Sequence, residues 1–355
     1  TPGGIQEAVD FAALHQAVVL AAALVDPGYL KALRKDLEEA WKAAGSPKDL
    51  FLSRDTPQGK ILVFGNGPSR HREDAAVLID LGGNDTYPEG AGATRPGLPV
   101  SILVDFEGND VYEAQKDQAQ GSGRLGVGIL ADLKGDDRYK GESHCQGTAT
   151  LGIGILWDAA GKDRYEAQQI AQGTALGGVG LLIDLGGNDE YIADRFAQGT
   201  GLPIALGALI DQKGDDRYTI RPVFQTGYIG PEWKGAFDGF GQGFGYGIRN
   251  TGAGDVIDVN SSFGGGIGAL VDSEGNDAYE APLFSMGCGY FFGWGILRDR
   301  KGNDRFEALG RALGSGVHEA SGYAEDLAGN DVHRLARGSG MGEACEACCK
   351  TVWSI

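Results

Sequence analysis

Long hydrophobic runs and an excess of positive charge are both missing from this 355-residue sequence. No apolar stretch reaches the ~20 residues that a helix needs to cross a bilayer, and the longest candidate, 17–25, is less than half that length. Acidic residues outnumber basic residues by 49 to 31, which gives a formal net charge of −18. Such a charge opposes binding to phosphate backbones and to anionic lipid surfaces. We therefore expect no membrane insertion and no nucleic-acid partner, and cationic partners are favoured.

Cysteine is also scarce, and no group of residues forms a convincing catalytic constellation. The 5 cysteines are too sparse for a disulfide-held miniature fold. Cys345, Cys348 and Cys349 lie in a tail, 341–355, where no second pair and no nearby histidine completes a zinc site. Every candidate carboxylate recurs along the chain, whereas a catalytic pair should occur once in a cleft. The sequence therefore favours a protein that is not an enzyme.

Glycine, in contrast, is abundant, and it belongs to a repeat. The chain holds 61 glycines, which indicates many turns or close contacts between backbones. From 77 to 335 a unit of roughly 26 residues recurs about ten times. Each clear unit has Gly-x-Gly before a leucine, then Asp-x-x-Gly, a tyrosine, and a polar stretch ending in Gln-Gly, and weaker copies lie near Asn250 and Asp326. The unit predicts a strand with its leucine inward, a turn, a strand with its tyrosine inward and a glycine-rich return.

Two all-β architectures suit this unit. In a β-solenoid, or parallel β-helix, of about ten coils of roughly 26 residues, successive coils stack ~4.8 Å apart. In the alternative, each unit is a β-hairpin and the hairpins form one sheet; the Gly-x-Gly and tyrosine rhythm is similar to the MORN repeat. We expect the solenoid because identical side chains gain most when they stack on one another. In a solenoid Cys145 and Cys288 lie too far apart for a disulfide.

The regions outside the repeat predict three further parts. Residues 1–60 form an α-helical N-terminal segment or cap, because apolar residues follow helical spacing over 4–45 with a break at Pro27-Gly28. The solenoid domain then covers 61–340 and the cysteine-containing tail covers 341–355. Within the solenoid, an insert at 219–249 interrupts the rhythm and is rich in aromatic residues. We expect it to cover an apolar face, or else to offer Trp233, Phe237 and Phe240 as a platform for a flat ligand such as a sugar.

The strongest chemical signal is a pair of aspartate columns, one at each end of the repeated turn. In stacked coils, neighbouring carboxylates ~5 Å apart repel by about 3 kcal/mol at an effective dielectric constant near 20. Turn N–H groups, arginines or calcium ions can offset this repulsion. The first column comprises Asp80, Asp105, Asp132, Asp158, Asp184, Asp211, Asp272 and Asp299, and the second comprises Asp85, Asp110, Asp137, Asp163, Asp189, Asp216, Asp277 and Asp304.

Arginine divides these units into two groups. Arg138, Arg164, Arg217 and Arg305 directly follow the second aspartate in four units, where we expect them to neutralise it. The units without such an arginine are the better cation candidates. Their aspartates are Asp80, Asp85, Asp105, Asp110, Asp184, Asp189, Asp272 and Asp277. The alternative is that the aspartates only cap the turns.

Two of these turns resemble a known calcium-binding repeat. Gly82-Gly83-Asn84-Asp85-Thr86-Tyr87 and Gly186-Gly187-Asn188-Asp189-Glu190-Tyr191 resemble part of the RTX, or hemolysin-type, repeat. The period is about three times that of the RTX nonapeptide, and the third glycine is absent. The resemblance implies a parallel β-roll with calcium held by turn carbonyls and aspartate carboxylates, in a secreted or cell-surface protein of bacterial type.

Two functions from different classes follow from this sequence. The first is a non-enzymatic extracellular or cell-surface scaffold, stabilised by Ca²⁺, that acts by assembly with itself or by adhesion to other surface proteins. The second is a β-helix that binds or cleaves a polysaccharide through the aromatic insert.

Overall fold

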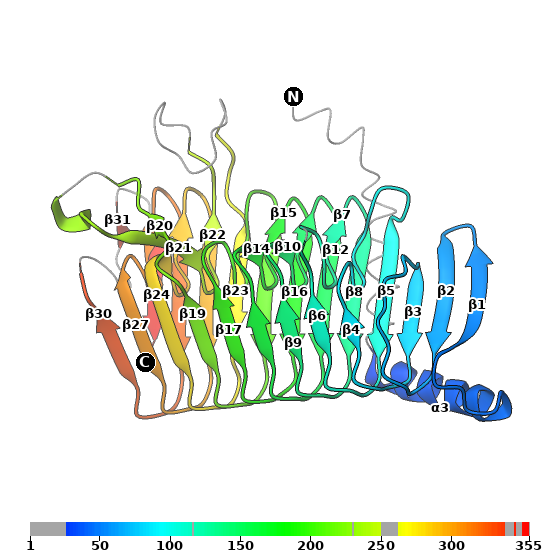
Figure 1. The fold of residues 1–355 in the computed structure, drawn as a ribbon. Helices are drawn as coiled ribbons and strands as arrows, with labels where there is room; N and C mark the ends of the chain where they lie inside the picture. Colours follow the sequence, from blue (N-terminus) through cyan, green and yellow to red (C-terminus); the bar gives the residue numbers. More distant parts are fainter. Residues whose placement is uncertain are drawn as a thin grey trace.

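The computed structural model describes residues 26–115, 117–228, 231–249, 262–337, 344–345 and 350–354 of the chain. They form a parallel β-solenoid of about nine coils, which confirms the predicted fold class (Figure 1). The hairpin sheet is excluded because the strands of successive coils pair in parallel. The predicted helix at 4–25 lies outside the described residues.

The largest sheet takes one strand from each coil. Its strands run in sequence order along the molecule, and equivalent residues pair, as Leu156 does with Leu182 and Asp158 with Asp184. Its strands are β1 (Leu50–Thr56), β2 (Gly59–Phe64), β3 (Val77–Asp80), β5 (Val100–Asp105), β8 (Val127–Asp132), β12 (Ile153–Asp158), β16 (Val179–Asp184), β18 (Leu206–Asp211), β23 (Ile267–Val271), β26 (Trp294–Asp299), β29 (Ser321–Asp326) and β32 (Lys350–Ser354).

The second sheet carries the tyrosines and follows the turn in each coil. Its register also keeps equivalent residues together, because Tyr165 pairs with Tyr139 on one side and with Tyr191 on the other. Its strands are β4 (Thr86–Tyr87), β6 (Val111–Glu113), β9 (Arg138–Lys140), β13 (Arg164–Glu166), β17 (Glu190–Ala193), β19 (Arg217–Ile220), β20 (Phe224–Gln225), β21 (Phe237–Gly241), β24 (Ala278–Ser285), β27 (Arg305–Gly310) and β30 (Val332–Leu335).

Short strands in the glycine-rich return complete each coil. Here the backbones approach so closely that a Cβ atom on Gly154 would lie 1.8 Å from the carbonyl oxygen of Thr148. These strands are β7 (Gly123–Arg124), β10 (Ser143–Cys145), β11 (Ala149–Thr150), β14 (Gln169–Ala171), β15 (Ala175–Leu176), β22 (Gly245–Tyr246), β25 (Gly289–Tyr290), β28 (Gly316–Val317) and β31 (Ala344–Cys345).

The core between the sheets consists of leucines from the first sheet and tyrosines from the second, as the repeat predicts. The rings of Tyr87, Tyr112, Tyr139, Tyr165 and Tyr191 stack nearly parallel, with centroids 4.6 to 4.8 Å apart. Cys145 and Cys288 are both buried and form no disulfide with each other, as expected from their separation along the solenoid.

One expected repeat does not form a coil of its own. Strand β18 pairs directly with β23, so the weak copy near Asn250 adds no strand to the first sheet. Asn250 itself lies outside the described residues. The copy near Asp326, in contrast, supplies β29, which pairs with β26 in the common register.

The described helix, α3 (Pro27–Ala43), lies at the N-terminal end of the solenoid (Figure 1). The side chain of Asp26 accepts a hydrogen bond from the N–H of Tyr29 and caps the helix, with proline following at the first helical position. Its apolar residues pack with the outward-facing side chains of the first sheet, among them Val104, and with Phe106 just beyond strand β5. The hairpin of β1 and β2 extends that sheet, so part of segment 1–60 is sheet.

Candidate metal centre

The first aspartate column joins the turn to the neighbouring coil. Asp158 shows the pattern: its Oδ1 accepts the N–H of Ala160, 3.1 Å away, and its Oδ2 accepts the hydroxyl of Tyr139, from the preceding coil, at 2.7 Å. The side chain is fully buried. Tyrosine hydroxyls reach the next coil's aspartate at 2.5 to 2.8 Å from Tyr87 to Tyr279. This column therefore contains the predicted turn caps.

The second aspartate column is only half satisfied. The Oδ1 of Asp163 accepts the backbone N–H of Asp137, from the preceding coil, at 2.6 Å. Its Oδ2 is buried and receives no hydrogen bond from any residue that the structure describes. The same oxygen lacks a donor throughout this column, at Asp85, Asp110, Asp137, Asp163, Asp189, Asp216, Asp277 and Asp304.

The electrostatics of the second column oppose free carboxylates. Burial, as the largest cause, raises the pKa of Asp110 to about 6, that of Asp189 to about 9 and that of Asp163 to about 11. The neighbouring charge of Asp158 adds to the effect on the pKa of Asp163. Burial also raises the pKa of Asp158 well above its usual range. Each coil must therefore neutralise its buried aspartates with protons or with a cation.

The two columns come close enough together to share a cation. Oxygens of Asp137, Asp158 and Asp163 lie within 4.8 Å of one another, and the next group, Asp163, Asp184 and Asp189, reuses Asp163. Oxygens bound to one Ca²⁺ at about 2.4 Å can be at most about 5 Å apart, so these groups have a suitable size. The set offers only oxygen, which hard cations prefer.

The turn glycine brings a backbone carbonyl to the same place. A Cβ atom on Gly161 would lie 1.7 Å from the carbonyl oxygen of Gly135 and 2.7 Å from both carboxylate oxygens of Asp163. Only glycine leaves this space open. The same close approach recurs at Gly135, Gly187, Gly214, Gly275 and Gly302. The residues present therefore fit an oxygen-ligated cation.

All eight aspartates selected from the sequence lie in these columns and are buried. The structure gives the same geometry to Asp132, Asp137, Asp158 and Asp163, which were not predicted as cation ligands because arginines follow in their units. The predicted neutralisation by arginine was wrong. Arg164, Arg217 and Arg305 pair with outward-facing glutamates, because neighbouring residues of a strand point to opposite faces.

Two histidines at the ends of the tyrosine column, His71 and His333, were not predicted from the sequence. His71 stacks on Tyr87 with ring centroids 4.7 Å apart, and His333 stacks on Phe306 at 4.8 Å. Each Nε2 lies beside a buried first-column carboxylate, that of Asp80 at 2.9 Å and that of Asp326 at 3.0 Å. For His71 the sequence did contain an indication. Ser69-Arg70-His71 lies just before the first repeat and corresponds to Asp85-Thr86-Tyr87, with which it pairs through Arg70 and Thr86.

The aromatic insert contributes to an apolar cluster of its own. Trp233 and Phe240 are 6% and 4% exposed, and Phe237 is half-buried. The ring of Phe240 stacks against Phe196 and Phe284, with centroids 5.0 and 5.2 Å apart. This burial favours the interpretation that the insert covers an apolar face, since two of the three rings offer little surface to a sugar.

Comparison with protein-family models, with curated proteins and with solved structures gives no match. Over the described ranges, no helix is both long and apolar enough to span a membrane. The function is therefore inferred from the geometry of the chain itself.

Proposed function

We propose that this chain is a non-enzymatic structural scaffold that is stabilised by calcium ions bound in a row along its two aspartate columns. One observation carries the proposal: in coil after coil, a buried Oδ2 of the second column receives no hydrogen bond from the described residues. A buried carboxylate oxygen without a partner is costly, and a bound cation removes that cost.

The charge of each coil matches a divalent ion. One aspartate of each column gives two carboxylates per coil, so one Ca²⁺ per coil leaves the row neutral. All the ligands offered are oxygens, namely carboxylates and the carbonyl beside the turn glycine. Ca²⁺ accepts 6 to 8 oxygen ligands in flexible geometry, whereas Mg²⁺ demands near-ideal octahedral geometry and retains several waters. A buried, repeated, oxygen-only row therefore suits Ca²⁺ better than Mg²⁺.

The position of the row supports a structural role. Its aspartates are 0 to 3% exposed and lie between two sheets, where no substrate can reach them. Each group also repeats its neighbour, so no single group has the distinct environment that acid and base catalysis requires. We place the protein outside the cell or on its surface, where calcium is abundant enough for weak sites, and we propose that it acts by assembly or adhesion.

Calcium titration of the chelator-treated protein, with thermal unfolding in calcium and in chelator, tests this proposal. We expect several ions bound per chain and a higher melting temperature in calcium. An ion at 100 times its dissociation constant adds about 2.7 kcal/mol per site to the free energy of unfolding. Identical melting curves in calcium and in chelator, together with no heat of binding, would remove the proposal.

A matched pair of variants assigns the effect to the interior. Asp137→Asn combined with Asp163→Asn removes two neighbouring ligands from the row, and we expect fewer bound ions and a smaller calcium-dependent rise in melting temperature. Asp136→Asn changes the charge by one unit beside Asp137, but Asp136 is exposed, and its side chain accepts a backbone N–H from Lys162 at 2.9 Å. Its calcium response should equal that of the unchanged chain.

A further inference from the structure

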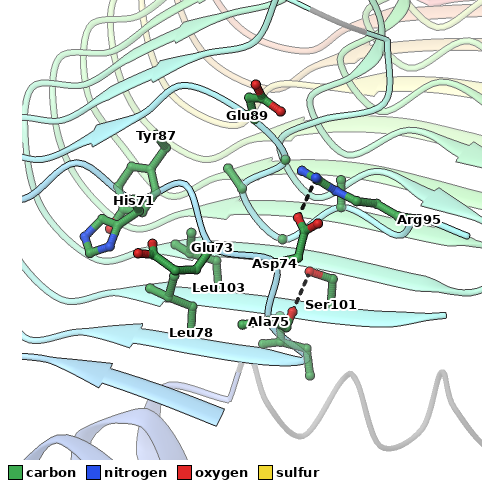
Figure 2. A pocket seen from close by; sticks show the side chains of 15 residues that line it. His71, Glu73, Asp74, Ala75, Leu78, Tyr87, Glu89, Arg95, Ser101 and Leu103 are labelled. Atoms are coloured by element: carbon green, nitrogen blue, oxygen red, sulfur yellow. Dashed lines mark hydrogen bonds and ion pairs between the residues drawn. The ribbon is translucent and has the colours of Figure 1, made fainter. Parts of the chain in front are cut away.

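The first coil differs chemically from the coils that follow it because a histidine occupies the tyrosine position, as His333 does only at the opposite end of the described column. His71 is 3% exposed, and its ring lies between Tyr87 and Phe64, whose centroids are 4.7 and 4.4 Å from it. Figure 2 shows His71 against Tyr87 in the wall of a pocket, with Glu73, Asp74 and Glu89 around that pocket. The histidine brings a nitrogen ligand to one end of an otherwise oxygen-lined row.

Asp80 and Asp85 each accept a backbone N–H on Oδ1, from Gly82 and Ser69, but the polar atoms that face His71 lack hydrogen bonds. Neither ring nitrogen of His71 has a hydrogen-bond partner among the described residues, and the same is true of the Oδ2 atoms of Asp80 and Asp85. The Nε2 of His71 lies 2.9 Å from Oδ2 of Asp80, but the N–H direction misses that oxygen. The tyrosine hydroxyls of the following coils, in contrast, do donate to their aspartates.

This separation is the one expected for two ligands of one metal ion. Ligand atoms about 2.1 Å from one metal ion lie about 3.0 Å apart in an octahedral site and about 3.4 Å apart in a tetrahedral one, and the lone pair of the nitrogen then points at the metal and not at the oxygen. The 2.9 Å between Nε2 of His71 and Oδ2 of Asp80 is near the first value and needs to widen by about 0.5 Å for the second. One ligand atom each from His71, Asp80 and Asp85 lies within 4.8 Å of the others. All three side chains are buried.

We propose that His71, Asp80 and Asp85 form a separate site for a divalent transition-metal ion of the zinc class. One imidazole and two carboxylates are the ligand types that Zn²⁺ accepts, and imidazole is a poor ligand for Ca²⁺, which prefers oxygen. The site closes the N-terminal end of the row, where the tyrosine column begins. It goes beyond the calcium proposal because it requires a different ion and a different ligand.

A small pocket borders this site on the side of His71. A cavity of about 20 Å³ is bordered by His71 and Tyr87, and it is large enough for a water molecule. Acidic side chains line it: Asp74, paired with Arg95 at 2.5 Å, and Glu73 and Glu89. Acidic groups at the mouth of a site raise the local concentration of cations.

The opposite end of the solenoid does not repeat this arrangement. His333 approaches Asp326 at 3.0 Å, but His333 is more exposed than His71. Asp331, which occupies the place of Asp85 there, is half-buried, and its Oδ1 accepts the N–H of Asp304. We therefore assign the nitrogen-containing site to the first coil.

Binding of Co²⁺ and Zn²⁺ to the chelator-treated full chain tests the proposal. We expect one Co²⁺ per chain with visible absorption bands, displaced by one equivalent of Zn²⁺, and nitrogen in the ligand sphere by X-ray absorption at the zinc edge. His71→Tyr restores the side chain of the other coils and should keep the fold, yet it should weaken Zn²⁺ binding at least ~100-fold because a metal ligand is lost.

Two outcomes would overturn the proposal. Equal Zn²⁺ affinity of the unchanged chain and His71→Tyr would show that the histidine is not a ligand. Absence of any stoichiometric Zn²⁺ or Co²⁺ binding would show that His71 serves only as a stacking partner of Tyr87. Calcium titration of His71→Tyr separates the two proposals, because the remaining coils keep their carboxylates and should bind Ca²⁺ whether or not the zinc-class site exists.

Discussion

The two aspartate columns have the same side chain and nearly the same burial, but their surroundings differ. Asp158 in the first column uses both oxygens, one for the turn and one for the hydroxyl of Tyr139. Asp163 in the second uses one oxygen for a backbone N–H and leaves the other without a donor among the described residues. The first column therefore holds the turn and joins adjacent coils. The second also joins coils, but it retains the capacity to bind a further ion.

This difference shows that burial alone does not identify a ligand site. Burial raises the pKa of aspartates in both columns, so the pKa does not separate a cap from a cation ligand. The number of hydrogen bonds that each carboxylate accepts does separate a cap from a cation ligand. A carboxylate that accepts a hydrogen bond on both oxygens gains less from a cation than one that accepts on a single oxygen. The following predictions test the contrast.

The largest effect is expected from pH, because many buried aspartates respond together. In chelator, folding keeps protons on second-column carboxyls whose pKa values are raised to between about 6 at Asp110 and about 11 at Asp163. The folded chain then binds more protons than the unfolded chain, so the free energy of unfolding is highest below about pH 4 and falls as pH rises through these values. Urea unfolding at pH 5, 7 and 9 in chelator measures the decline.

Saturating calcium should weaken or reverse that decline. Bound Ca²⁺ favours the ionised carboxylates, so metal binding strengthens as pH rises and offsets the loss of protons. A pH dependence that is the same in calcium and in chelator would contradict a cation-binding second column.

The next largest effect is expected from Gly161→Ala. Its Cβ atom would lie 1.7 Å from the carbonyl oxygen of Gly135 and would enter the space beside Asp163, so the coils must separate locally. We expect a loss of more than about 3 kcal/mol in the free energy of unfolding. The control is Gly264→Ala, where an added Cβ atom has no neighbour within 4 Å. Similar losses for both variants would show that close stacking at the turn does not limit stability.

A pair of isosteric variants compares the columns directly. Asp158→Asn places an amide N–H₂ opposite the buried hydroxyl of Tyr139, and we expect a loss of about 2–3 kcal/mol because that hydroxyl loses its acceptor. Asp163→Asn keeps the oxygen that accepts the N–H of Asp137, and its new N–H₂ replaces an oxygen without a donor. In chelator it should change the free energy of unfolding by less than about 1 kcal/mol. Equal losses in urea unfolding would show that the columns are equivalent.

The repeat made most of the architecture predictable. A constant spacing of Leu, Asp and Tyr placed equivalent residues on top of one another, and the stacked rings of Tyr139, Tyr165 and Tyr191 follow from it. The sequence could not reveal the hydrogen-bond partner of each carboxylate oxygen, because that depends on the orientation of side chains across two sheets. The arginine prediction failed for this reason, since Arg164 follows Asp163 in the chain but faces outward to Glu190.

Departures from the repeat were harder to interpret. Phe306 takes the place that tyrosine holds in the other repeats, whereas the hydroxyls of Tyr165 and Tyr191 donate to buried aspartates. Phe306 has no hydroxyl to donate to Asp326, the aspartate of the next coil. His333, which pairs with Phe306, lies beside that aspartate. His71 was missed because the first coil keeps only part of the repeated sequence, and its alignment with Tyr87 comes from strand pairing.

The smallest effect is expected from the tyrosine hydroxyls taken singly. Tyr191→Phe keeps the ring stack but removes the donor that lies 2.7 Å from Asp211. We expect a loss of about 1 kcal/mol in urea unfolding, because a protonated Asp211 carboxyl limits the cost of the missing hydrogen bond. Phe306→Tyr is the matched reverse change, and it should alter the free energy of unfolding by less than about 0.5 kcal/mol because His333 already lies 3.0 Å from Asp326. No measurable loss for Tyr191→Phe would mean that the stacked rings alone hold the coils together, and that the first column differs from the second less than its hydrogen bonds indicate.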